Sequence, residues 1–173
     1  MKKLLFLLSA LIIAAIPLQA DEPSKDTKTS YHKEVLDSAE KFVIKPKGGK
    51  GDVEPLRKKK YLFIYFSASW CGPCKVFTPK LVDFYKKNER NRDFDVLFIS
   101  LDSDQKAMTA YMKSEKMPWM GVKHGSKGAN EIKTKYAGAG VPHLVLLNEK
   151  DEVIAVGQAN VMNAYEAARK KRK

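Results

Sequence analysis

The motif Trp70-Cys71-Gly72-Pro73-Cys74-Lys75 limits what this chain can fold into more than any other feature. It follows an apolar run at 61–66 and a short link at 67–69, which together predict a buried strand, a turn and a helix that begins at the motif. Cys71 and Cys74 are the only cysteines among 173 residues, so any disulfide within one chain must join them. Two thiols at this spacing can close a small ring and reopen it readily, which is what dithiol–disulfide exchange requires.

Two structural interpretations of the cysteine pair are weaker. A structural disulfide between Cys71 and Cys74 would enclose only Gly72 and Pro73. It would stabilise the fold little, because the loop-closure entropy that a disulfide removes from the unfolded chain grows with loop length. A structural zinc site needs more ligands, and the sequence has no second cluster of cysteine and histidine. We therefore expect a redox role with no metal and no cofactor, since no flavin, haem or nucleotide motif is present either.

The first segment of the chain, residues 1–20, has the pattern of a signal peptide. Lys2 and Lys3 precede an apolar stretch at 4–16, and Ala20 offers a small residue for cleavage. An uncleaved membrane anchor is the alternative, although the stretch is short for a bilayer. We expect an exported protein, located in a bacterial periplasm, whose residues 21–41 form a polar N-terminal extension containing a short helix near its end.

The chain is strongly basic, with a formal net charge of +12, and loss of residues 1–20 removes two lysines and no acid. Such a balance can indicate nucleic acid or an anionic membrane as the partner. The lysines are spread along the chain, however, and no nucleic-acid motif accompanies them. We expect a solvated basic surface with a basic tail and no specific nucleic-acid partner.

Beyond the motif, apolar strand patterns alternate with helical ones. Pro79 lies inside the helix that starts at the motif and should kink it. Asp102 or Ser103 is expected to cap the helix that follows the second buried strand. The expected strands are 42–44, 61–66, 94–99, 143–147 and 153–156. The expected helices are 72–87, a segment through Met108 and Met112, a short stretch near Ile132 and a closing helix at 160–168. This order predicts an α/β domain with a mixed sheet.

The motifs resemble the thioredoxin fold. Trp-Cys-Gly-Pro-Cys-Lys with Pro79 is similar to thioredoxin itself. The flanking segments are closer to the tryparedoxin and nucleoredoxin branch; they are 65–70, 77–81, 100–104 and 117–119. The resemblance covers about residues 42–168 and implies a thioredoxin-like domain at 42–173 that ends in the basic tail. A mixed central sheet flanked by helices is the architecture it implies.

The resemblance also assigns roles to the motif. Cys71 at the helix start would attack substrate disulfides, because unpaired backbone N–H groups and the helix dipole favour an anion there and should lower the pKa of the thiol. Cys74 would resolve the mixed disulfide, and Gly72 and Pro73 would shape the turn. Trp70 and Trp119 are expected beside the cysteines as exposed apolar surface that holds substrate; ordinary packing is the alternative.

Other implied roles belong to the segment 141–143. Pro142 occupies the position of a cis-proline, which would present the Val141 backbone to a substrate strand and keep metals from bridging the thiols. Two positions depart from the thioredoxin pattern. Tyr65 replaces a buried acid, so deprotonation of Cys74 must rely on water or another group. His143 stands where a small residue is usual, and we expect it either to stabilise the Cys71 thiolate when protonated or to have no role.

The resulting expectation is an exported thiol–disulfide oxidoreductase that reduces disulfides in client proteins. It would act as a monomer and be recharged by a membrane-bound thiol electron donor. The Gly-Pro pair favours a reducing couple like that of thioredoxin, whose potential is about −270 mV. A disulfide oxidase or isomerase would suit an oxidising compartment, although no dimerisation segment supports an isomerase. A binding module that uses the fold without catalysis is a third alternative.

Overall fold

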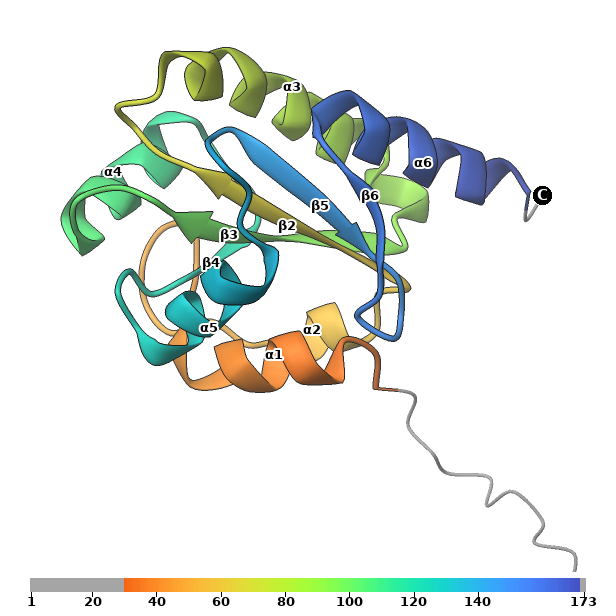
Figure 1. The fold of residues 1–173 in the computed structure, drawn as a ribbon, viewed down its shortest axis with the longest axis horizontal. Helices are drawn as coiled ribbons and strands as arrows, with labels where there is room; N and C mark the ends of the chain where they lie inside the picture. Colours follow the sequence, from red (N-terminus) through yellow and green to blue (C-terminus); the bar gives the residue numbers. More distant parts are fainter. Residues whose placement is uncertain (1–29, 172–173) are drawn as a thin grey trace, which may run out of the picture.

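A mixed sheet of six strands forms the middle layer of the protein, in the order β1-β4-β3-β2-β5-β6 (Figure 1). The computed structural model describes residues 30–171, so the expected signal peptide and the last two residues of the basic tail lie outside the described part. The strands are β1 (Val43–Ile44), β2 (Tyr61–Ser67), β3 (Phe94–Ser100), β4 (Met120–Val122), β5 (His143–Leu147) and β6 (Val153–Val156). The helices are α1 (Lys33–Ala39), α2 (Glu54–Arg57), α3 (Gly72–Lys87), α4 (Gln105–Ser114), α5 (Lys127–Tyr136) and α6 (Gln158–Lys170), with short 3₁₀ turns at Glu40–Phe42 and Glu89–Asn91.

Strands β2 and β3 lie at the centre of the sheet because both are apolar at nearly every position. They run parallel, with Tyr61 opposite Phe94 and Ser67 opposite Ser100. Every residue of both strands is buried, as expected for strands covered on both faces. Strand β5 pairs antiparallel with β2 and forms the predicted hairpin with β6. The α/β thioredoxin-like architecture expected from the sequence is confirmed.

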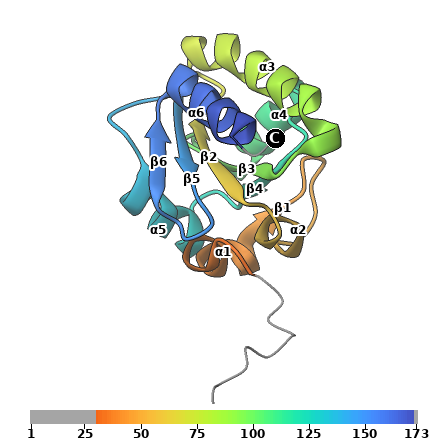
Figure 2. The ribbon, with the colours of Figure 1, turned by 90° about the vertical axis from the view of Figure 1, so that its right-hand side faces the viewer.

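Helices cover both faces of this sheet (Figures 1 and 2). On one face, α3, α4 and α6 enclose an aromatic cluster that includes Phe63, Phe94 and Tyr165. On the other face, α1, α2 and α5 enclose a mainly aliphatic cluster that includes Leu36, Ile64 and Ile132. Among the described residues no helix is long and apolar enough to cross a membrane.

The folded unit begins earlier than residue 42, where the resemblance sets its start. Val35, Leu36 and Ala39 of α1 are buried against the sheet and α5. Gly128 at the start of α5 lies so close to the carbonyl oxygen of Ser38 that an added Cβ would collide with it. The two helices therefore pack backbone against backbone, and α1 is part of the domain.

A buried histidine fixes the entry to α1. His32 is completely buried, and its Nδ1 lies 3.2 Å from Asp151 Oδ1. Its Nε2 lies 2.8 Å from the carbonyl oxygen of Lys59. The second carboxylate oxygen of Asp151 accepts hydrogen bonds from the backbone N–H groups of Glu34 and Val35. This arrangement ties the start of α1 to the β5–β6 turn.

The structure differs from the sequence expectations in several elements. Neither the three residues of β4 nor the single turn of α2 was expected. The cap of α4 is Asp104, whose carboxylate accepts a hydrogen bond from the N–H of Ala107, and not Asp102 or Ser103. Helix α3, in contrast, has the predicted bounds, Gly72–Lys87, with Pro79 inside it, and the kink expected at Pro79 stays a prediction.

Candidate active site

The link between β2 and α3 places both cysteines at the start of a helix, above the central strand of the sheet. Cys71 is the N-cap of α3, and its Sγ accepts a hydrogen bond from the N–H of Cys74 at 3.2 Å. Pro73 lies in the first helical turn, where a residue without an N–H costs no helical hydrogen bond. The local sequence thus directs an orphan backbone donor of the helix at the first sulfur.

The two cysteines are joined by a disulfide, with Cα atoms 5.2 Å apart. Their exposure differs: Cys71 retains 5% of its surface, whereas Cys74 is completely buried. A partner that approaches from solvent therefore reaches the Cys71 sulfur first. The expected order, with Cys71 as attacking thiol and Cys74 as resolving thiol, remains a prediction that this geometry favours.

The loop before β5 faces the disulfide. The Val141–Pro142 peptide bond is cis, as the resemblance to the thioredoxin fold implies. The Val141 carbonyl oxygen lies 3.5 Å from Cys71 Sγ, close enough to accept a hydrogen bond from the reduced thiol. Gln158 at the start of α6 donates to the Pro142 carbonyl oxygen at 2.8 Å and holds this loop in place.

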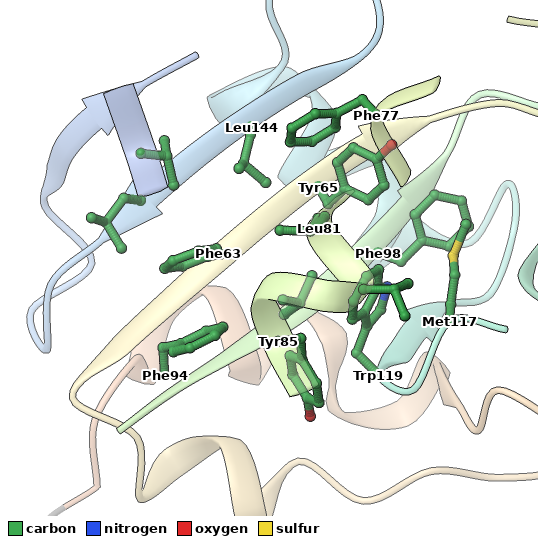
Figure 3. Packing of buried hydrophobic residues seen from close by; sticks show 14 of the residues in the cluster. Phe63, Tyr65, Phe77, Leu81, Tyr85, Phe94, Phe98, Met117, Trp119 and Leu144 are labelled. Atoms are coloured by element: carbon green, nitrogen blue, oxygen red, sulfur yellow. The ribbon is translucent and has the colours of Figure 1, made fainter. Parts of the chain in front are cut away.

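The two tryptophans lie in different environments. Trp70 is 66% exposed beside the disulfide, and its Nε1 donates to the Leu101 carbonyl oxygen at 3.1 Å. Trp119 retains only 1% of its surface and packs edge-on against Tyr65 and Tyr85 inside the aromatic cluster (Figure 3). The expectation that Trp119 is exposed beside the cysteines is wrong, because the segment before β4 places this residue in the cluster that α3 and α4 cover. Ordinary packing is its role.

Tyr65 belongs to a buried network of hydroxyl groups beneath α3. Thr78 donates its only hydroxyl hydrogen to the Cys74 carbonyl oxygen, so Tyr65 and Tyr111, at 2.7 and 2.8 Å from Thr78 Oγ1, must both donate to it. Ser67 then donates to Tyr111. Burial raises the pKa of Tyr65, so the phenol stays neutral at physiological pH and is not a base for Cys74.

His143 begins β5 with its ring on the face of the sheet that α5 covers. Its ring packs against Phe66 with centroids 5.7 Å apart, and its Nε2 lies 3.2 Å from the Tyr136 carbonyl oxygen at the end of α5. These contacts assign His143 to the joint between α5 and β5. Its effect on the Cys71 thiolate stays a prediction, and within residues 30–171 the contacts of His143 are to Phe66 and Tyr136 and not to Cys71.

The sequence did not reveal that Asp102 holds the segment before Cys71 by hydrogen bonds, an arrangement called here the Asp102 clamp. Asp102 is 6% exposed, and its carboxylate accepts hydrogen bonds from the N–H of Ser69 at 2.7 Å, from the Ser69 hydroxyl at 2.6 Å and from the Ser100 hydroxyl at 2.7 Å. This clamp joins the loop after β3 to the loop after β2. The sequence contained a signal for these hydrogen bonds, because Asp102 lies between Ser100 and Ser103 after a buried strand. The same pattern also permitted Asp102 to be a helix cap.

Comparisons with known proteins agree with this geometry. A family model described as "Thioredoxin-like" matches residues 59–154. The chain is 30% identical to probable nucleoredoxin 1 of Arabidopsis thaliana over 143 residues, which is 82% of this chain and 24% of that protein. It is 35% identical to the tryparedoxin of Trypanosoma brucei brucei over 101 residues, 58% of this chain and 69% of that one. The chain thus spans about a quarter of the length of the nucleoredoxin.

Solved structures show the same fold. A thioredoxin from Wuchereria bancrofti superposes with a TM-score of 0.65 at 32% identity, covering 75% of this chain and 96% of that chain. Tryparedoxin II from Crithidia fasciculata superposes with a TM-score of 0.62 at 31% identity, covering 78% and 91%. With a matching family model, a shared fold and a Cys-Gly-Pro-Cys pair at the helix start, the chain belongs to the thioredoxin-like family.

Proposed function

We propose that this protein reduces disulfides in other proteins by dithiol–disulfide exchange at Cys71 and Cys74. The observation that carries the proposal is the asymmetry of the pair. Cys71 caps the helix, keeps 5% of its surface exposed and receives a backbone N–H, whereas Cys74 lies completely buried one turn deeper. A helix N-terminus stabilises a thiolate at the first position, which is the form that attacks.

The exchange proceeds in two balanced steps. The Cys71 thiolate attacks one sulfur of the client disulfide, forms a mixed disulfide and releases the other client sulfur as a thiolate. Cys74 then loses its proton to water and attacks Cys71 Sγ, which releases the second client thiolate and forms the Cys71–Cys74 disulfide. Two electrons pass from the dithiol to the client disulfide.

Client binding follows from the surroundings of Cys71. The Val141 backbone, held beside the disulfide by the Gln158 contact, would pair with an extended client segment. The exposed Trp70 would cover apolar groups of that segment. Trp119 is excluded from this role by its burial.

The proposal includes export and a source of electrons. The pattern of residues 1–20 supports transfer to a bacterial periplasm, where a membrane-bound thiol donor would reduce the Cys71–Cys74 disulfide again. Fractionation of cells that express the full chain, with N-terminal sequencing of the product, tests the location. A mature N-terminus near Asp21 in the periplasmic fraction supports export, and a full-length cytoplasmic product refutes it.

The function is tested by the reduction potential of the purified protein in defined thiol–disulfide buffers. A value near −270 mV, about that of thioredoxin, supports a reductase; a value near −120 mV, about that of a strongly oxidising disulfide donor, would assign the pair to disulfide oxidation. In a separate trapping experiment with cell extract, Cys74→Ser should capture clients as stable mixed disulfides, whereas Cys71→Ser should capture none. If Cys71→Ser retained the cellular activity, the protein would be a binding module.

A further inference from the structure

A groove at the β1–β4 edge of the sheet has the chemistry of a binding site that disulfide exchange does not use. Its volume is about 720 Å³, and two segments far apart in the sequence line it. The first is the loop after β1 at 45–48, and the second runs from the end of α4 to β4 at 112–118. The volume lies within the range of sites that accept a short peptide or a small molecule.

The floor of this groove is apolar. Met112 and Met117 are almost completely buried, and Pro46 and Pro118 form its sides. Figure 3 shows Met117 at the border of the aromatic cluster, beyond Trp119. Methionine side chains adapt to apolar groups of different shape, and prolines offer no N–H donor. The floor can therefore hold an apolar side chain but provides few backbone hydrogen bonds.

The rim of the groove is positively charged. Lys45 and Lys47 line it from the first segment, and Lys113 and Lys116 line it from the second. Lys116 has φ of +53°, a conformation that favours glycine at the end of a helix, yet a charged side chain stands there. Within residues 30–171, none of the four lysines forms a salt bridge.

Basic side chains around α1 and α2 have a different environment. Around α1 and α2, Arg57 bonds Asp37 at 2.7 Å, and Lys135 bonds Glu34 at 2.6 Å. These two basic side chains are each paired with a carboxylate. The groove, in contrast, is lined by lysines from two segments and by no acidic residue. The positive charge of the groove is therefore complementary to a negatively charged partner.

We propose that this groove binds an acidic peptide segment of another protein, with an apolar side chain on the methionine floor and carboxylates on the lysine rim. Ammonium groups on both sides match several spaced carboxylates better than a single one. The site stands at the β1–β4 edge, apart from the end of the central strand β2 that leads to the disulfide, so binding here and exchange there are separable.

The test uses a fluorescein-labelled pentapeptide in which one leucine lies between two pairs of glutamates. Its binding to the protein is measured by fluorescence anisotropy. We expect Lys113→Gln with Lys116→Gln to weaken binding about tenfold, because each rim contact contributes a modest exposed ion pair. The matched control is Lys86→Gln with Lys87→Gln in the last turn of α3, which removes the same charge and should leave binding unchanged. Peptides with glutamine for glutamate, or serine for leucine, should bind more weakly than the parent.

The same measurements can overturn the proposal. Equal weakening by the control pair would show attraction to net charge alone. Unchanged binding of the serine peptide would show that the floor is not used. Binding to vesicles of anionic lipid in preference to the peptide would assign the lysines to a membrane surface. Circular dichroism of each exposed-lysine variant confirms that the fold is intact before the comparison.

Discussion

Asp102 holds Ser69 through two hydrogen bonds to one carboxylate oxygen, 2.7 Å from the Ser69 N–H and 2.6 Å from its hydroxyl. Ser69 precedes Trp70, whose indole donates to the neighbouring Leu101 carbonyl oxygen. The β3–α4 loop therefore fixes the two residues before Cys71. A buried carboxylate thus positions the segment that leads to the Cys71 sulfur without contacting that sulfur.

Replacing Asp102 with asparagine should loosen this link. The amide accepts weaker hydrogen bonds than the carboxylate and directs an N–H₂ group at a hydroxyl, so we expect a loss of about 1–3 kcal/mol in the free energy of unfolding. Urea titration measures the loss of stability. A changed Trp70 fluorescence and slower thiol–disulfide exchange would show the effect at the site. The matched control is Asp104→Asn at the cap of α4, where asparagine caps as well as aspartate. Equal effects of the two substitutions would contradict a role at the site.

Removing the Tyr65 hydroxyl tests whether the buried network transfers protons. In Tyr65→Phe, Thr78 loses one of its two donors, which should cost about 1 kcal/mol of stability. Because burial raises the pKa of Tyr65, the phenol is not a base at neutral pH, and the exchange rate should be nearly unchanged. The rate of mixed-disulfide resolution against pH is the measurement. A drop of about tenfold would show that Tyr65 takes part in proton transfer.

The His32–Asp151 contact should carry a large part of the stability of the N-terminal segment. Both ring nitrogens of His32 face oxygen atoms in a completely buried site, so His32→Ala leaves the Asp151 carboxylate short of a partner. We expect a loss of about 3–5 kcal/mol in the free energy of unfolding. A double-mutant cycle with Asp151→Ala separates the pair from lost packing. Strict additivity of the two losses would show that no coupling exists.

Asp95 should make the protein less stable as the pH rises. Burial raises the pKa of this carboxyl above its ordinary value of 3.8, although the N–H of Val96 and the nearby Arg92 oppose the shift. The unfolded chain therefore releases this proton at lower pH than the folded protein does, and stability falls as pH rises from 3.8 through the raised value.

Urea titrations of wild type and Asp95→Asn across this pH range isolate the effect. The stability of wild type relative to the variant should decrease with rising pH, because the amide does not ionise. A difference that stays constant, or that grows with pH, would refute the assignment.

The sequence predicts the parts of the fold that have strong local signals. The continuous apolar runs of β2 and β3 and the turn at 149–151 between β5 and β6 indicate strands by themselves. Strand β4 has only three residues and α2 a single turn, and both depend on neighbours that the sequence does not place side by side. Short elements of this kind are set by tertiary packing.

The sequence likewise predicts some features of the candidate site and not others. The spacing of Cys71 and Cys74 identifies the chemistry, but the direction of a side chain at a sheet edge is not visible in the sequence. Trp119 is buried because β4 pairs with β3, and His143 bonds the end of α5 because of its register opposite Phe66. The lysine groove joins residues from two distant segments, so only the folded chain reveals it.

The close approach of Gly128 to the Ser38 carbonyl oxygen sets a minimum length for any functional fragment of this chain. A version that began at residue 42, where the resemblance begins, would leave the surface of α5 around Ala129 and Ile132 facing water. Such a truncation would expose an apolar patch suited to self-association. Recombinant forms, and any fusion that places another domain upstream, should therefore be joined before His32.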